Sequence, residues 1–526
     1  MKTIILALTA GVTLAATAFG AQPPDVTTSD SNGNTAMGSY ALLSLSGGHA
    51  NTGAGYAPLY STTTGYYNTA FGYKALYSNT TGFDNIAIGG LTLISNTTGF
   101  DSVAIGGATL SANTTGNTNI AIGTDALTTN TTGSVNIAIG VDTLEVNTTG
   151  QNNIGIGASA LIGNTTGSSN IAIGIQALHS NTTGFNNLAV GELALTSNTT
   201  GHGNVAIGLT ALANTTGDNN VGVGVNVLNA NTTASNNTAI GYGALTTNTT
   251  GSANTASGTY ALVSNITGYN DTADGTYALF KNTTGYSNAA IGYFALAHNT
   301  TGANNVAIGD SALVANTTGS NNTVLGGLAG GNLTTGSNNI DIGNQGVAAE
   351  GNTIRIGNRQ TATYIAGIFG APVTGSPVYV SSNGQLGVVV SSERFKTAIA
   401  PMGSNAAKLQ LLRPVTFRLK SDGTGMRQYG LIAEEVAKVY PELVIRDEKG
   451  RIDGVRYDEL TPILLNEVLR QAGEIRELKE LVLHMQAGLK AQTKEEVVLR
   501  RSKSLFTVRD IAPEQPPLIA RNSSLA

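Results

Sequence analysis

The chain of 526 residues contains no cysteine and no tryptophan, and only 11% of its residues are charged. The absence of cysteine excludes disulfides as a source of stability. A hydrophobic content of 41% excludes the composition of a disordered chain, and 67 glycines are too many for an ordinary globular mixture. The fold must therefore be stabilised by repetitive packing and by oligomerisation.

The few charges are unevenly distributed. Between positions 34 and 343 there are 2 basic and 11 acidic residues, whereas from position 391 to the end there are 22 basic and 18 acidic residues. The first segment has almost no cations to neutralise phosphates, so we expect no nucleic-acid binding. Its histidines are isolated and its acids are out of phase with any repeat, so we expect no metal, no cofactor and no catalysis there.

The N-terminus has the pattern of an export signal. Lys2 supplies a positive charge, residues 4–16 are apolar, and residues 18–20 form a small-x-small cleavage site. The apolar run is too short to span a bilayer, and no later segment approaches a membrane span. We therefore predict a signal peptide over residues 1–20, a mature chain with no transmembrane anchor, and a secreted or cell-surface location on a bacterium.

A unit of 17 residues repeats along the middle of the chain after a lead-in over residues 21–33. It reads Asn-Ile-Ala-Ile-Gly-x-x-Ala-Leu-x-x-Asn-Thr-Thr-Gly-x-x and is clearest at residues 136–152. Its first position recurs nineteen times, from Asn34 to Asn339, and is asparagine in all cases except Ser102 and Asp271. The glycine four residues later is present in all nineteen units.

Each unit is predicted to form one coil of a parallel β-solenoid, so the fold class is mainly β. The alternation in Ile-Ala-Ile indicates a short strand, and Asn-Thr-Thr-Gly is typical of a turn. Stacked coils bury one another's apolar faces, and the repeated asparagines are expected to form an amide ladder. At about 4.8 Å per stacked strand, nineteen coils give a rod of about 90 Å.

Other interpretations of the repeat concern its outer surface. The strict phase of the Asn-x-Thr triplets favours turns over glycosylation sites. A flat ice-binding or carbohydrate-binding face made by the threonine pairs stays an alternative. Aromatic residues after the turn glycine are candidate ligand contacts, although such residues are more often partly covered surface: Tyr66, Phe83, Phe100, Phe185, Tyr269 and Tyr286.

With these motifs, the rod at residues 34–357 resembles the heads of trimeric autotransporter adhesins. The repeats of that family also centre on a Ser/Asn-Val/Ile-Ala-Ile-Gly strand, and the resemblance implies parallel β-rolls wound as trimers. The unit is longer here than in that family. The resemblance therefore implies a trimeric fibre and leaves its mode of surface attachment open.

The composition changes after residues 358–390, which are predicted to be a β-rich connector. Several motifs then follow in order: Ser-Ser-Glu-Arg-Phe-Lys from 391, Leu-Arg-Pro-Val-Thr-Phe from 412, Tyr-Gly-Leu-Ile-Ala-Glu-Glu-Val from 429, Tyr-Pro-Glu-Leu-Val from 440 and Val-Arg-Tyr-Asp-Glu-Leu from 455. Together they resemble the intramolecular chaperone domain of phage tail spikes and fibres, the peptidase S74 family. We assign this α+β domain to residues 391–489 and a flexible tail to residues 490–526.

From about residue 465 this domain is predicted to form a coiled-coil helix, with Pro462 in its first turn. Residues with three-four spacing form its seam, with one polar core position: Val468, Gln471, Ile475, Leu478, Val482, Met485 and Leu489. An amphipathic helix packed on its own domain is the alternative.

The chaperone resemblance implies two activities. The domain brings three chains into register, and many members of the family then cleave themselves with a serine nucleophile and a lysine base. At matching positions these residues are Ser391 and Lys396, while Ser392 replaces the usual aspartate. The overall prediction is a secreted homotrimeric fibre, adhesive or structural, with a host surface or a polysaccharide as ligand. The alternatives are a tail-fibre component of a phage-like particle and a polysaccharide-binding or ice-binding solenoid. The chain has no recurring carboxylate pair for an enzyme acting on external polysaccharide.

Overall fold

The computed structural model describes residues 28–365, 378–381, 384–388, 390–420, 425–447 and 449–504. Contacts divide the chain into two compact units, Met1–Ile365 and Ala366–Ala526. The predicted signal peptide and residues 505–526 of the predicted tail lie outside the described residues.

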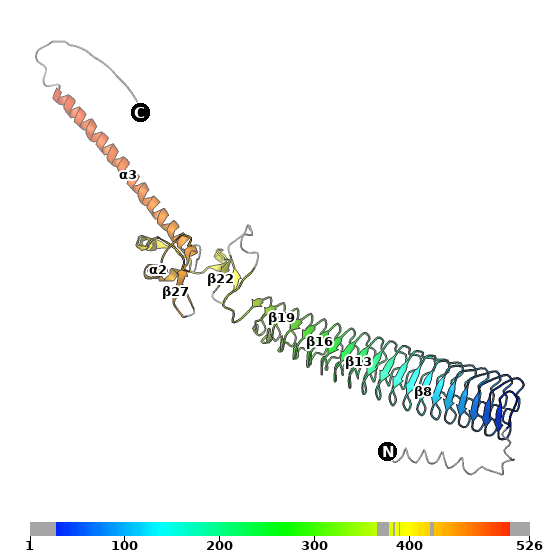
Figure 1. The fold of residues 1–526 in the computed structure, drawn as a ribbon. Helices are drawn as coiled ribbons and strands as arrows, with labels where there is room; N and C mark the ends of the chain where they lie inside the picture. Colours follow the sequence, from blue (N-terminus) through cyan, green and yellow to red (C-terminus); the bar gives the residue numbers. More distant parts are fainter. Residues whose placement is uncertain are drawn as a thin grey trace. The chain divides into compact units, whose positions relative to one another are not determined.

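The first unit is a parallel β-solenoid, in which each coil contributes one short strand to a single sheet (Figure 1). Neighbouring coils pair in register, as in Ile137↔Ile154. This confirms the predicted fold. The strands are β1 Thr28–Ser29, β2 Thr35–Met37, β3 Thr52–Ala54, β4 Thr69–Phe71, β5 Ile86–Ile88, β6 Val103–Ile105, β7 Ile120–Ile122, β8 Ile137–Ile139, β9 Ile154–Ile156, β10 Ile171–Ile173, β11 Leu188–Val190, β12 Val205–Ile207, β13 Val221–Val223, β14 Thr238–Ile240, β15 Thr255–Ser257, β16 Thr272–Asp274, β17 Ala289–Ile291, β18 Val306–Ile308, β19 Thr323–Leu325, β20 Ile340–Ile342 and β21 Ile354–Ile356.

The interior of the solenoid is narrow and holds small or repeated side chains. In the coil at residues 136–152, Ala138 in the middle of the strand and Leu144 after it are completely buried. Ile139 points the other way and is 37% exposed. The alternation of the strand thus places alanine inside and isoleucine outside, and a continuous row of alanine and leucine forms the core along the coils.

The backbone explains why glycine is invariant at the end of the strand. Gly140 has a φ of 138°, and a Cβ atom there would lie 2.7 Å from the carbonyl oxygen of Gly157 in the next coil. Leu144 also has a left-handed backbone, with a φ of 54°, which is uncommon for a residue with a side chain. Its buried side chain and a 3.0 Å bond from its N–H to the Ala160 carbonyl oxygen hold it there.

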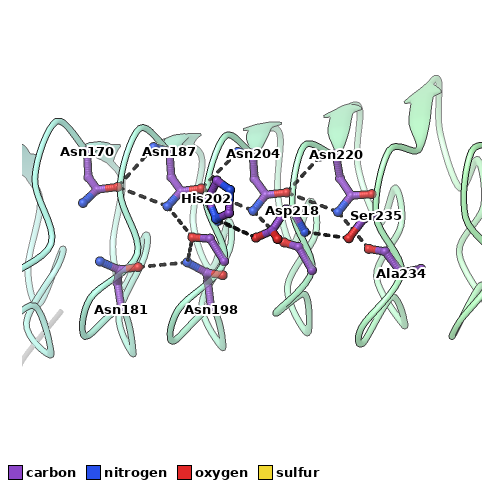
Figure 2. A network of polar contacts seen from close by, with 12 residues as sticks. Asn170, Asn181, Asn187, Asn198, His202, Asn204, Asp218, Asn220, Ala234 and Ser235 are labelled. Carbon is purple, nitrogen blue, oxygen red and sulfur yellow. Dashed lines mark hydrogen bonds and ion pairs between the residues drawn. The ribbon is translucent and has the colours of Figure 1, made fainter.

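Two buried asparagine ladders run along the coils (Figure 2). In the first ladder, Asn187 Nδ2 donates to Asn170 Oδ1 at 3.1 Å and to the Gly201 carbonyl oxygen at 2.8 Å. In the second, Asn198 Nδ2 donates to Asn181 Oδ1 at 2.8 Å and to the same Gly201 oxygen at 3.1 Å. The expected ladder is confirmed, and the turn asparagines form another one. Because the turn asparagines are buried, they are inaccessible as glycosylation sites in the folded chain.

One coil, which begins at Asn204, is shorter by one residue, and its turn places Thr215 where the second ladder has asparagine. Thr215 accepts a bond from Asn231 Nδ2 at 3.2 Å. Within the described residues, the buried Asn198 Oδ1 has no hydrogen-bond partner. The slip in the repeat therefore interrupts the second ladder at this coil.

The two ends of the solenoid are closed differently. The antiparallel strand β1 covers the edge of β2, with Thr28 opposite Ala36. At the other end, Arg355 of β21 donates to both carboxylate oxygens of Glu350 at 2.8–3.0 Å. Asp341 of β20 is buried nearby, and desolvation raises its pKa to about 6. Each inner strand is paired on both sides within one chain, so only the two ends present strand edges.

The second unit contains three two-stranded antiparallel sheets and several helices. Its elements are β22 Tyr379–Val380, β23 Leu386–Gly387, η2 Glu393–Phe395, η3 Gly403–Leu411, β24 Val415–Phe417, β25 Gln428–Gly430, α2 Ala433–Val439, η4 Pro441–Leu443, β26 Val444–Arg446, β27 Ile452–Val455 and α3 Tyr457–Ser504. A small core joins α2, η4 and the start of α3 through Val436, Tyr440, Leu443, Val444 and Leu460.

Helix α3 is longer than predicted at both ends. It begins at Tyr457, so Pro462 lies inside the helix instead of in its first turn. Two acidic residues favour this early start because they lie at the positive end of the helix. Residues 490–504, assigned to a flexible tail, are helical, since they contain only good or moderate helix formers and no glycine or proline. Over the ranges described above, no helix is long and apolar enough for a bilayer crossing.

Candidate functional site

The structure brings together both predicted site residues at the start of the second unit. Lys396 Nζ donates to Ser391 Oγ at 3.1 Å. Both side chains are exposed in the single chain. A serine hydroxyl within hydrogen-bond reach of an amine is the geometry of a nucleophile and its base.

The short helix η2 between the two residues produces this geometry. The Phe395 N–H bonds to the Ser392 carbonyl oxygen and the Lys396 N–H to the Glu393 carbonyl oxygen, both at 3.0 Å. This turn folds the chain back so that a lysine five residues after the serine reaches it. Arg394 lies 4.6 Å from the centre of the Phe395 ring and adds a cation–π contact to the same turn. Ser392 stands at the N-cap of η2, but its side chain makes no capping bond.

Three motifs that are separate in sequence meet in the domain that follows. Arg413 forms an ion pair with Glu435 at 2.6 Å, and this contact lowers the pKa of the Glu435 carboxyl. The Leu431 N–H donates to Tyr457 Oη at 2.8 Å. The motif beginning at 429 is therefore tied to the motif beginning at 412 and to the one beginning at 455. The sequence reasoning named these motifs but did not identify the contacts, because pairing across such separations has no local signal.

Comparison with known families gives one match in this part of the chain. Residues 391–445 match the family model described as the chaperone of endosialidase. This segment is therefore similar to the peptidase S74 family. The match begins at Ser391 and includes β24, β25 and α2. No curated protein and no solved structure is significantly similar to the chain.

Helix α3 of the second unit has an apolar side that is largely uncovered in the single chain. Helix α3 packs on its own domain near Leu460, and further along Leu478 and Leu489 are 59% and 65% exposed. The apolar seam positions are all exposed: Val468, Ile475, Leu478, Val482, Met485 and Leu489. Gln471, the polar seam residue, donates to Glu467 Oε1 at 2.8 Å. Among the described residues nothing covers this apolar row, which disfavours a helix that packs only on its own domain.

Proposed function

We propose that the chain is a secreted homotrimeric fibre, assembled by its chaperone domain, which then separates from the rod by self-cleavage. The observation that carries the proposal is the match of residues 391–445 to the chaperone of endosialidase, which follows a long β-solenoid and a connector. A domain of this family at the end of a repetitive rod supports a fibre of the tail-fibre type.

The exposed row of α3 supports assembly through three helices. Apolar residues at three-four spacing are the seam of a coiled coil, and a single amide such as Gln471, once buried between helices, would specify register and partner number. In the single chain, the row exposes large side chains such as Leu478 to water. Association of three α3 helices would remove this apolar surface from water and align the chains.

The contact between Ser391 and Lys396 supports the cleavage step. Lysine acts as a base only as the neutral amine, which burial or a neighbouring cation favours. In the trimer, neighbouring copies would supply that environment. Ser391 Oγ then attacks the carbonyl carbon of Val390, and its proton passes through Lys396 to the Ser391 nitrogen. The peptide bond is exchanged for an ester, and water hydrolyses the ester to give a Val390 carboxylate and a free Ser391 hydroxyl.

The mass of the intact secreted protein tests this proposal. Wild type is expected to give two products, residues 21–390 and 391–526, at a rate that rises with pH because the base must be neutral. Ser391→Ala and Lys396→Met are expected to remain full length but still trimeric. Ser392→Ala is the matched control and should be cleaved, while Ser392→Asp should be cleaved faster. A folded wild-type trimer that stays intact for days would limit the domain to its chaperone role.

An adhesive role is supported by aromatic rings on the rod. Tyr66, Phe83 and Phe100 form a partly exposed stack along three coils, with ring centres 4.9 and 4.8 Å apart. Stacked rings are suitable for contact with the apolar face of a sugar. Loss of binding to a polysaccharide array in Phe83→Ala, with the trimer retained, would identify this row as the contact.

A fibre of a phage-like particle is the second candidate, because the chaperone domain that carries the proposal is compatible with it. The secreted fibre and the particle fibre differ in whether the chain is exported with removal of its signal peptide. N-terminal sequencing of the mature protein is expected to begin at residue 21 for a secreted fibre. An unprocessed Met1 would favour the particle component.

A further inference from the structure

One side of the solenoid is an apolar surface that runs along the strands. From β3 to β20 the middle residue of each strand is buried, while the first and third residues point outward, as in β8. Most outward isoleucines at the third position are exposed to a similar degree, with 36% for Ile105 and 38% for Ile308, although Ile240 is 47% and Ile356 at the end of the rod 70% exposed. From β2 to β21, the third residue is apolar in every strand except β15 and β16, which have Ser257 and Asp274.

The turn region of each coil has the opposite character. In the coil at residues 136–152, Thr149 is exposed, and Thr148 Oγ1 donates to the Thr165 carbonyl oxygen at 3.0 Å. Most threonines at this turn position are hydrogen-bonded to the next coil in the same way, as Thr165 Oγ1 is to the Thr182 carbonyl oxygen. The solenoid therefore has a polar turn side with satisfied hydroxyls and an apolar strand side, which we call the strand face.

We propose that the strand face is the surface on which copies of this chain pack along the rod, parallel and in register around a common axis. The proposal rests on the homotrimeric fibre proposed above and adds which face of the coil forms the contact. The occupant has to match a surface that repeats every 17 residues along the coils. A second copy of the same rod has this period, whereas a globular partner would cover only a few coils.

The size of the strand face is sufficient for such a contact. Three strand residues span about 10 Å and each coil adds about 4.8 Å along the rod, so one coil contributes about 50 Å². Eighteen of the strands from β2 to β21 have an apolar third residue, which gives about 900 Å² per copy. A stable protein interface needs about 800 Å² from each partner. Because each strand is already paired within its own chain, the contact between copies is made by side chains and not by added strands.

The absence of cysteine in the chain allows a direct test by single-cysteine cross-linking. Ile105→Cys and Ile139→Cys place one thiol on the strand face. Thr115→Cys and Thr149→Cys place one on the turn side of the same coils and are the matched controls. Each full-length variant is treated with a short bismaleimide, covalent dimer is measured on a denaturing gel, and circular dichroism confirms that each variant folds.

At least tenfold more covalent dimer is expected from the strand-face variants than from the controls. Sedimentation of untreated wild type separates the possible failures. If wild type is a monomer, both the trimer and the strand-face contact are overturned. If wild type is a trimer but the turn-side variants cross-link as well as or better than the strand-face variants, only the strand-face contact is overturned. A trimer in which none of the four variants cross-links also overturns it, since the rods would then lie apart.

Discussion

Replacing Asp271 with asparagine is expected to stabilise the rod at neutral and alkaline pH but not in acid. Asp271 is the acidic member of the first ladder and is buried, and its carboxylate accepts bonds from the Asn288 N–H at 2.8 Å and from Asn282 Nδ2 at 3.2 Å. When ionised it cannot donate to Asn254 Oδ1, as an asparagine would. Burial disfavours the charged form, and this desolvation raises the pKa of Asp271 from 3.8 to about 7, although the bonds from Asn288 and Asn282 lower it.

The direction and size of the effect follow from this pKa. The folded chain binds the proton more tightly than the unfolded chain, so stability is greatest below pH 3.8, falls as the pH rises to about 7, and is constant above that. The full change is about 4 kcal/mol per chain, which corresponds to about a 1,000-fold change in a local unfolding equilibrium. Asp271→Asn removes this cost because the amide is neutral at every pH.

Hydrogen exchange by mass spectrometry, on peptides from the coils around position 271, measures this local equilibrium. Variant and wild type are compared at the same pH, so that intrinsic exchange rates cancel. We expect slower exchange in Asp271→Asn by up to about 1,000-fold at pH 8 and by less than about fivefold at pH 4. Asp274→Asn removes an exposed carboxylate from the same coil and is the control. An equal effect at both pH values, or the same effect from Asp274→Asn, would refute the reasoning.

Three further predictions concern the ladder, the invariant glycine and the chaperone. Thr215→Asn supplies a donor for Asn198 Oδ1 and should stabilise the neighbouring coils by about 1 kcal/mol in the same exchange assay; faster exchange would show that the shortened coil cannot accept the amide. Gly140→Ala should lower the thermal midpoint by more than Gly90→Ala, because a Cβ at 140 meets the Gly157 oxygen at 2.7 Å whereas one at 90 meets nothing within 4 Å; equal midpoints would contradict this. Deleting residues 391–526 should leave a rod that aggregates, and efficient refolding of residues 21–390 into soluble trimers would contradict a need for the chaperone.

Much of the fold was predictable because the same strand and turn pattern recurs in every unit of the repeat. The alternation in Ile-Ala-Ile indicated a strand, but periodicity alone does not say which side is inside. Ala138 is inside because the coil is too narrow for larger side chains on both of its walls, and this leaves Ile139 outside. The second ladder was not predicted, because its asparagines also satisfy the rules for turns. A turn asparagine is distinguished from a ladder asparagine only by its bond to the next coil, and that bond exists only once the coils are stacked.

Less of the candidate site than of the fold was predictable from the sequence. Ser391 and Lys396 came from a family resemblance, and the spacing of five residues has a local explanation in the turn of η2. The pair of Arg413 with Glu435 and the bond to Tyr457 join segments more than twenty residues apart. No short pattern encodes such contacts. The exposed pair also lacks, in a single chain, the burial that lysine needs to act as a base, so its chemistry depends on neighbouring copies that one sequence does not describe.

The rod and the C-terminal domain differ in how well each can fix the alignment of neighbouring copies in the proposed fibre. Among the described residues, the coils bury their alanine and leucine core and form nearly complete ladders, and the strand face and the seam of α3 are two apolar surfaces that stay exposed. A strand face with a 17-residue period can pair with a neighbour one coil out of step and lose only one coil of contact. The seam of α3 has no such period, and the single Gln471 distinguishes one alignment from the others. In the proposed fibre, the C-terminal domain would therefore set a register that the repetitive rod cannot set alone. If the strand faces pack as proposed, that register would be held along the whole rod, and cutting before Ser391 would then remove the C-terminal domain without releasing the chains.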